Sequence, residues 1–419
     1  MRAQTLRSFW PLALIVLGVA LRGGFGLAHP PQKEGIDNTD DYVFLATSLA
    51  RTGTLALSTV PSAEREPAYP VYLALFFKSL GRSYATVLTA NCLCAALGLW
   101  LVFLLGRRLF GEVPALLALA LYAVYPQAIY YAAQPRREVM MATVGLLGVW
   151  SLLRAWDRGS LAAFALAGAA GALGGLTNTT FLPFQLIVAP LALFWLKRGQ
   201  LARGLRWIGI YLAVLVALYA SWPLRNYVVF KTWILGSTAG SGTTFYKYLV
   251  VPIELGGTQE EDRLFQQDPN AQVMLGTDKL AVDKAYWRLG LEWVRHRPWA
   301  YAKLVARRFA WGMWRPVPFR RAYGISYDAI RWTSLLTDAW IIPLGFAGMA
   351  CAGLSPPLLF VYLFFFSLDF SYSLMQIGVR YRFSFMPWLI LFAAFAACRL
   401  SRLALPAGST KEGPPDGSR

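Results

Sequence analysis

Charged side chains are scarce in this sequence. Asp, Glu, Lys and Arg make up 15% of its 419 residues, whereas roughly a quarter is usual in soluble globular domains. Hydrophobic residues make up 57%, and the mean hydropathy is +0.45. This composition excludes an ordinary soluble domain. Many apolar runs approach the roughly 20 residues that a helix needs to cross a bilayer, so the sequence predicts an all-α polytopic membrane protein.

Cysteine and histidine are also few. The two histidines, His29 and His296, lie far apart along the chain, so neither is predicted to be a ligand or a base. The cysteines all lie in apolar segments, where we expect them to pack rather than to form a disulfide framework or a metal site. They are Cys92, Cys94, Cys351 and Cys398.

Acidic residues number 22 against 40 basic ones, which gives a formal net charge of +18. In a chain this apolar, the excess indicates basic cytoplasmic loops and contacts with anionic membrane lipids. No basic segment carries a nucleic-acid recognition motif, so no nucleic-acid partner is predicted.

Apolar segments of spanning length recur along the chain, and about ten or more transmembrane helices are predicted. The shorter apolar stretch 68–80 is expected to lie at the interface or to be re-entrant. The start of the chain has no convincing signal-peptide cleavage site. The predicted spans are 9–28, 84–106, 112–131, 139–156, 160–177, 181–196, 206–223, 332–353, 356–375 and 383–400.

The distribution of Arg and Lys among the short loops predicts a cytoplasmic N-terminus in a cell inner or plasma membrane. The first outer loop (29–83) and a long segment with amphipathic helices (224–331) are then extracytoplasmic. A membrane core (1–223), the last spans (332–403) and a disordered cytoplasmic tail (404–419) complete the predicted organisation.

The first outer loop concentrates negative charge. The stretch "GIDNTDDYVF" holds Asp37, Asp40 and Asp41 just before a predicted helix whose apolar face includes Tyr42. A helix N-terminus favours carboxylates, so Asp40 could serve only as a cap. It could equally belong to an active site.

Arginines occur at the same predicted membrane face, where positive charge is unusual. Arg136 and Arg137 lie in one short turn, and Arg380 and Arg382 in another. Such residues can reach lipid phosphates from the membrane edge. Their grouping opposite an acidic loop also suits a bound phosphate, which guanidinium groups hold in a bidentate way.

Four stretches, taken in order, resemble bacterial GT-C glycosyltransferases of the protein-mannosyltransferase-like group, which includes the aminoarabinose transferases. The spacing of the stretches carries the likeness more than any one motif does. They are "DDYVFLATSLARTG" with "REPAYPVYLALFF", "QPRREVMMATVGLLGVWSLLRA", "SWPLRNYVVFKTWILGSTAGSGTTFYK" and "RYRFSFMPWLILFAA".

The resemblance implies a helical membrane core with outer loops over an extracytoplasmic cavity. It also implies transfer of a sugar from a polyprenyl-phosphate carrier to a glycan, lipid or protein acceptor. One base and a direct displacement would invert the anomeric centre. The family's loop-one acid falls at Asn38 here, so the catalytic carboxylate stays open among Asp37, Asp40, Asp41 and Glu66. Candidate phosphate-binding residues are Arg65, Arg136, Arg137, Arg225, Arg380 and Arg382.

Two other classes of function remain as alternatives: a transporter or flippase for lipid-linked sugars, and a non-catalytic subunit that binds them. A transporter would place ionisable residues near the middle of its spans, whereas the charges here cluster at their ends. A divalent metal could bridge loop-one carboxylates and phosphate, but no metal site is predicted.

Overall fold

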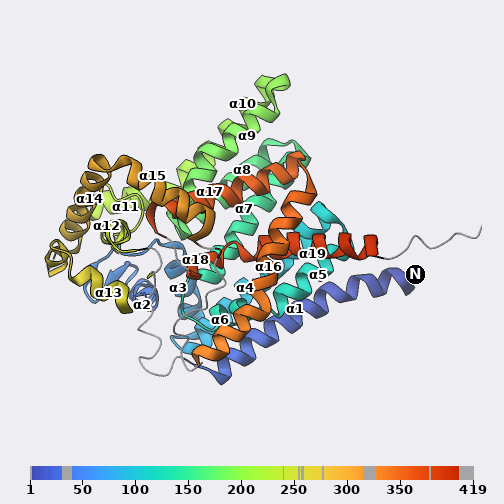
Figure 1. The fold of residues 1–419 in the computed structure, drawn as a ribbon, viewed down its shortest axis with the longest axis horizontal. Coiled ribbons are helices and arrows are strands. Elements are labelled where there is room, and N and C mark those ends of the chain that lie inside the picture. Colours follow the sequence, from blue (N-terminus) through green and yellow to red (C-terminus); the bar gives the residue numbers. More distant parts are fainter. Residues whose placement is uncertain are drawn as a thin grey trace, which may run out of the picture.

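The computed structural model describes residues 2–30, 40–238, 240–252, 255, 259–275, 278–312, 314, 326–376 and 379–404. Asp37 and the tail from residue 405 lie outside these residues. Within them the chain is almost wholly helical (Figure 1). The one sheet described is a two-residue antiparallel pair, β1 (Ala56–Leu57) and β2 (Val60–Pro61).

Seven described helical segments are long and apolar enough to cross a membrane. They match seven of the ten predicted spans, which confirms a multi-pass helical membrane protein. The segments are Phe9–Ala28, Tyr84–Phe110, Glu138–Arg158, Thr179–Leu196, Arg198–Phe230, Arg331–Ala352 and Pro356–Met375. The helices within them are α1 (Arg2–Ala28), α4 (Tyr84–Phe110), α7 (Glu138–Arg158), α9 (Ala189–Leu196), α10 (Leu201–Tyr219), α11 (Ser221–Phe230), α16 (Tyr327–Ala352) and α17 (Pro356–Met375).

The other three predicted spans differ from simple straight crossings. Predicted span 112–131 is bent by 54° between α5 (Glu112–Ala123) and α6 (Pro126–Ala132). Proline starts the second helix because it has no N–H to donate and suits the first turn. α8 (Leu161–Thr177) and the apolar part of α19 (Met386–Ala404) are shorter than a usual span.

Small residues allow some helices to approach closely. A Cβ atom added at Gly168 of α8 would lie 2.3 Å from the carbonyl oxygen of Tyr211 in α10. One added at Gly348 of α16 would lie 2.1 Å from the carbonyl oxygen of Phe392 in α19. Glycine at these positions therefore permits backbone contact between membrane helices, where tight packing drives association.

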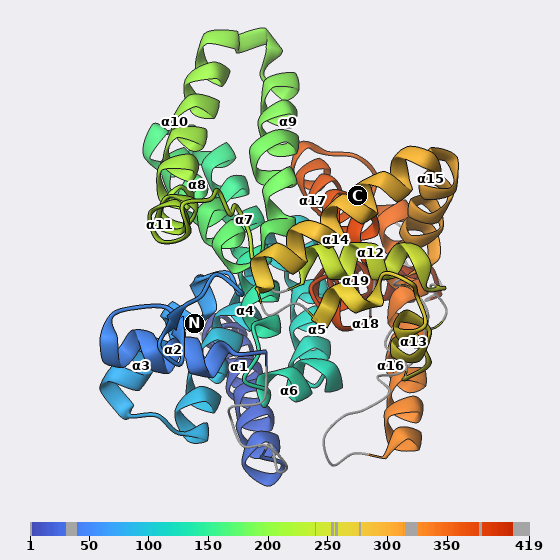
Figure 2. The same ribbon diagram turned by 90° about the vertical axis from the view of Figure 1, so that its left-hand side faces the viewer.

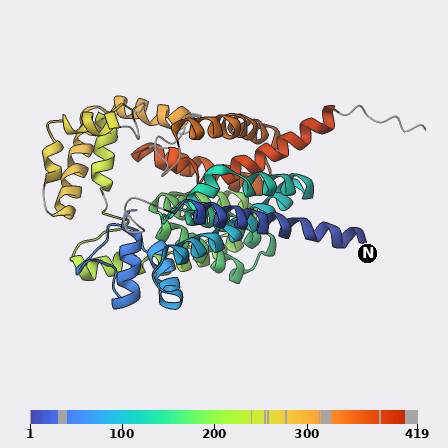
Figure 3. The same cartoon turned by 90° about the horizontal axis from the view of Figure 1, so that it is seen from below.

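The connecting helices gather at one end of the bundle, here called the loop end. Figures 1 and 3 show α11–α14 on the side away from the N-terminus and from the last turns of α19. α2 (Tyr42–Thr52) and the predicted short segment α3 (Ala68–Leu80) pack on each other there. The remaining loop-end helices are α12 (Ser241–Val250), α13 (Gln259–Gln266), α14 (Lys279–His296), α15 (Pro298–Arg307) and α18 (Val379–Arg382).

α9 and α10 form a helical pair that projects from the body of the molecule at the top of Figures 1 and 2, joined through η4 (Arg198–Gln200). Two short irregular turns, η2 (Thr179–Phe181) and η3 (Phe184–Val188), lead from α8 into α9. They place Thr177 and Thr179 at the loop end, next to the first loop.

Candidate active site

Asp40 is where three arginines from different parts of the chain converge. Its Oδ2 accepts a hydrogen bond of 2.7 Å from Nη2 of Arg380 and lies 3.8 Å from Nη1 of Arg136. Its Oδ1 lies 3.7 Å from Nη2 of Arg65, whose Nε donates to the Asp40 carbonyl oxygen at 2.8 Å. Three of the six predicted arginines therefore meet Asp40 of the acidic loop at one end of the bundle.

The backbone at Asp40 and Asp41 is left-handed, with φ of 59° and 61°. This conformation is uncommon outside glycine and is better tolerated by Asp than by most residues. Asp41 is the N-cap residue of α2, yet its side chain makes no cap hydrogen bond. The capping explanation for Asp40 is therefore not supported, since its carboxylate binds arginine instead. Asp41 has no ion pair within the described residues.

Glu138, at the start of α7, is a second acid at this site. It was not predicted from the sequence as a partner of the arginines. Arg380 donates through Nε to its Oε1 and through Nη2 to Asp40, so one guanidinium bridges two carboxylates. Glu138 is buried. Its position directly after Arg136-Arg137 was the signal available in the sequence.

Glu66 and Arg137 form a neighbouring buried ion pair. Nη1 of Arg137 donates to Oε2 of Glu66 and to the Thr177 carbonyl oxygen at 3.0 Å. Oε1 of Glu66 accepts from the backbone and hydroxyl of Thr179, each at 3.4 Å. Both oxygens of Glu66 are thus occupied. Tyr42 lies beneath Arg137 and Arg65, with its ring centroid 5.9 and 5.6 Å from their Cζ atoms.

Arg225 and Arg382 are held elsewhere. Arg225 donates to the carbonyl oxygens of Ser62 and Leu55 at 2.8 and 2.9 Å, which ties α11 to the first loop. Arg382 is fully buried and donates to Asp338 of α16. Neither arginine is bonded to Asp40.

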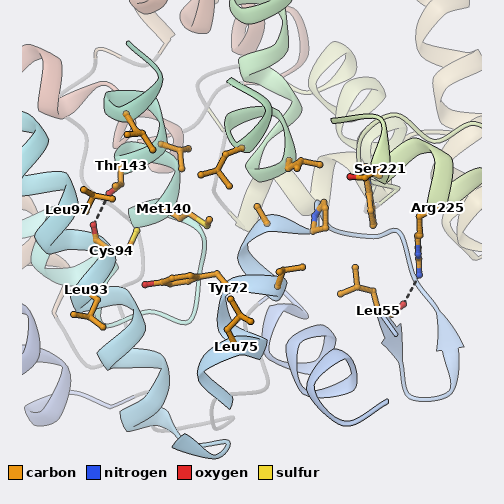
Figure 4. Close-up of a pocket in the computed structure, with 18 residues that line it drawn as sticks. Leu55, Tyr72, Leu75, Leu93, Cys94, Leu97, Met140, Thr143, Ser221 and Arg225 are labelled. Carbon is orange, nitrogen blue, oxygen red and sulfur yellow. Dashed lines mark hydrogen bonds between the residues drawn. The ribbon is translucent and has the colours of Figure 1, made fainter. Parts of the chain in front are cut away.

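An apolar cavity of about 610 Å³ lies beside the first loop. α3, α4, α7, α8 and α11 line it, and Arg225 and Ser221 lie at one edge (Figure 4). Leu75 and Leu93 on its wall are 62% and 55% exposed, so the cavity opens through the side of the bundle. In a membrane such an opening faces lipid.

The charges at the Asp40 cluster do not cancel. Arg65, Arg136 and Arg380 oppose Asp40 and Glu138, which leaves one net positive charge. Two buried polar atoms of the cluster, Nε of Arg136 and Oε2 of Glu138, have no hydrogen-bond partner in the described part of the chain. A half-buried site with an unused donor and excess positive charge is suited to an anion.

The arginines keep Asp40 ionised. Burial by itself would raise the pKa of this carboxyl, but Arg380, Arg136 and Arg65 outweigh it and lower the pKa to about 2. Burial would likewise lower the pKa of Arg380, whereas Glu138 and Asp40 raise it well above its ordinary value. Asp40 and Arg380 are therefore both charged near neutral pH.

This pKa shift predicts a pH-dependent stability. The pKa of this carboxyl is lower in the folded protein than in the unfolded chain (about 2 against 3.8). Its contribution to the free energy of unfolding is therefore complete above about pH 4 and is lost as the pH falls towards about 2. The shift corresponds to about 2 kcal/mol. Unfolding of wild type and Asp40→Asn in detergent, measured from pH 7 to pH 2.5, should show the advantage of the wild type shrinking below pH 4. Parallel curves would contradict the ion-pair geometry.

No group of three or more metal-ligating side chains occurs among the residues that the structure describes. Of the acids at this site, Asp40 and Glu138 are bridged by Arg380, which donates to both. The site is thus built for charge pairing with guanidinium groups.

Residues 64–224 match the family model for dolichyl-phosphate-mannose-protein mannosyltransferases. The match covers less than half of the chain, but it includes Arg65, Glu66 and the Arg136–Glu138 turn, and it ends one residue before Arg225. No curated protein matches the chain significantly.

Two structures of the Archaeoglobus fulgidus oligosaccharyltransferase share the fold. The apo form superposes with a TM-score of 0.58 at 15% identity, covering 94% of this chain and 52% of that one. The complex of that enzyme, AglB, with an inhibitory peptide and a dolichol-phosphate gives 0.53 at 13% identity, covering 96% and 52%. The chain therefore spans about half the length of these relatives.

ArnT from Cupriavidus metallidurans bound to undecaprenyl phosphate also matches, at 15% identity over 95% of this chain and 78% of that one. Its TM-score of 0.39 is too low to support a shared fold by itself. The AglB superpositions confirm the GT-C-like helical membrane fold predicted from the sequence, and residues 64–224 are similar to the mannosyltransferase family.

Proposed function

We propose that this chain, a multi-pass membrane protein of the GT-C group, is an inverting glycosyltransferase. Its donor would be a sugar carried on a polyprenyl phosphate, and its acceptor a glycan, lipid or protein at the extracytoplasmic face of an inner or plasma membrane. The matched mannosyltransferase segment supports the reaction class. One fold relative was solved with a dolichol-phosphate.

The observation that carries this proposal is the convergence of Arg65, Arg136 and Arg380 on Asp40 at the loop end. A carrier phosphate at the membrane surface offers charged oxygens to guanidinium groups, which bind them in a bidentate way. The net positive charge of the cluster and the unused Nε of Arg136 favour such an anion.

In the proposed reaction, the acceptor oxygen bonds to the anomeric carbon as the bond from that carbon to the phosphate oxygen breaks. The acceptor hydroxyl gives its proton to Asp40, and the phosphate leaves with its electron pair. A departing phosphate is already a stable anion, so the arginines, rather than an acid, stabilise it. A single displacement inverts the anomeric centre.

Donor binding would also activate Asp40. With a pKa of about 2, its carboxylate is a weak base while three arginines surround it, and base catalysis works best when the pKa lies near the operating pH. The negative charge of a bound phosphate would offset the positive charges of Arg65, Arg136 and Arg380. The pKa of Asp40 would then rise, and base strength would appear only after the donor has arrived.

The other candidate residues take supporting roles in this proposal. Glu66 holds Arg137 and joins the first loop to the turn after α8. Arg225 fixes the first loop beside the apolar cavity, whose lipid-facing opening suits part of a hydrocarbon chain. Asp41 would be at most a secondary acid, and Asp37 lies outside the described residues.

The test is sugar transfer by the purified protein in detergent. Radiolabelled undecaprenyl-phosphate sugars serve as donors, and envelope extracts of cells without the gene serve as the acceptor pool. Product in an organic-insoluble or lipid fraction, matched by one sugar missing from the glycans of those cells, is the expected result. Unchanged glycans together with no transfer from any donor would overturn the proposal.

A transporter would need ionisable groups along a path through the membrane. In the described spans, Asp338 and Asp369 are buried in α16 and α17, and Asp338 is paired with Arg382. A transporter predicts donor movement across vesicles without glycan transfer, which the same purified protein can be tested for.

A further inference from the structure

Asp338 is a fully buried carboxylate within a membrane helix, and the reaction proposed above does not use it. Its Oδ1 accepts a hydrogen bond from the hydroxyl of Tyr125 at 2.6 Å. Its Oδ2 accepts from Nε2 of Gln127 at 2.6 Å and from Nη2 of Arg382. Both oxygens are therefore engaged by three residues from two distant parts of the chain.

The depth of Asp338 makes these partners important. It is the eighth residue of the span Arg331–Ala352, so it lies about 10 Å along the helix at 1.5 Å per residue. An ionised side chain at such a position is costly unless it is paired, and intramembrane acids commonly have functional roles. Arg382 supplies the pairing charge and is itself fully buried.

Through Arg382, Asp338 is connected to the helix that carries Arg380. Arg382 is the last residue of α18, the four-residue helix that also carries Arg380. A helix this short has little packing of its own, so its position depends on such anchors. Arg380 leaves the same helix to bridge Asp40 and Glu138.

Through Tyr125 and Gln127, Asp338 is connected to the segment that carries Arg136 and Glu138. Tyr125 and Gln127 flank the 54° bend between α5 and α6. α6 ends at Ala132, and the turn that follows it carries Arg136 into α7. The ring of Tyr131 also lies 4.9 Å from that of Phe383, directly after α18, so the two segments pack together.

We propose that Asp338 is a positioning residue that holds α18 and the α6–α7 turn together, so that Arg380 meets Asp40 and Glu138. Asp338 contacts the start of α6 and Arg382 of α18, and Glu138 contacts Arg380 of α18. Because α6 continues through the turn to Glu138, these elements form a closed ring. The catalytic consequence rests on the proposed transferase function. The placement of α18 does not, and it can be measured without substrate.

Hydrogen–deuterium exchange of the full-length protein tests the placement. Asp338→Asn keeps the side-chain shape but removes the negative charge that pairs with Arg382. Backbone exchange should rise in peptides covering 379–385 and 133–138. The matched control is Asp369→Asn, which removes a similarly buried carboxyl from α17. Within the described residues, Oδ1 of Asp369 accepts no hydrogen bond. Equal exchange in Asp338→Asn and wild type would overturn the proposal, even if the protein has no transferase activity.

A double-mutant cycle then tests the link to Arg380. Asp338→Asn should lower kcat at least about tenfold, since small displacements of a positioning group can cost about 10²-fold. In an Arg380→Ala background the same change should cost less than about twofold, because the group it positions is already gone. Equal factors in both backgrounds would show a merely stabilising role and overturn the proposal.

A milder variant covers the case in which Asp338→Asn does not fold. Tyr125→Phe removes one hydrogen bond to Asp338 and keeps the ion pair. It should raise exchange in the same two peptides to a smaller extent. No change in either peptide would count against the proposal as strongly as the first result.

Discussion

Asp40→Asn should reduce sugar transfer by about 10²–10⁴-fold, the usual contribution of a general base. The amide keeps the size of the side chain but cannot take the acceptor proton, so kcat should fall much more than the affinity for the donor. The measurement is single-turnover transfer with purified protein and radiolabelled donor. Its unfolding temperature in detergent would confirm that the variant is folded.

Asp41→Asn is the matched control for this substitution. Asp41 is the adjacent aspartate and is also left-handed in backbone, but it has no ion pair among the residues described. It should retain activity within about tenfold of wild type, because acids that contact no reacting group lack the contribution of a base. A larger loss in Asp41→Asn than in Asp40→Asn would reverse the assignment of the two acids.

Arg380→Lys should lower kcat by about 10²-fold or more, comparable to losing one donor of an oxyanion-stabilising site. Lysine keeps the positive charge, but its single ammonium cannot reproduce the planar fork that bridges Asp40 and Glu138. The loss should appear in kcat more than in KM, since charge on the leaving phosphate grows in the transition state.

The control is Arg399→Lys, the same exchange at an arginine of α19 that bonds the Cys351 carbonyl oxygen at the opposite end of the bundle. Its activity should match that of wild type. Full activity in Arg380→Lys, with donor binding also unchanged, would show that Arg380 takes no part in the reaction. Its contacts with Asp40 and Glu138 would then have a structural role only.

The spans could be predicted because their signal is local. A run of apolar side chains must become a helix in a membrane wherever it occurs, so seven predicted spans appear as continuous helical segments. The bend at Tyr125 was missed because a proline at a first helical turn and a proline that interrupts a span look alike in sequence.

The site was predicted in outline only. Hydropathy and the Arg/Lys distribution placed the acids and arginines at one membrane face, and the resemblance named their chemistry. Distinguishing Asp40 from Asp41 needed the two left-handed residues that aim only one carboxylate at Arg380. Separating Arg380 from Arg382, two positions apart, needed the direction of each side chain on α18.

The sequence by itself therefore determined the membrane class, most of the helices and the end of the bundle where opposite charges gather. These follow from short-range patterns and from the cost of burying unpaired backbone in lipid. The tertiary structure decided which charges meet, because Asp40 and Arg380 are 340 positions apart. Asp338 belongs to that second group: a lone acid in an apolar span indicates a role, but only packing identifies Arg382, Tyr125 and Gln127 as its partners.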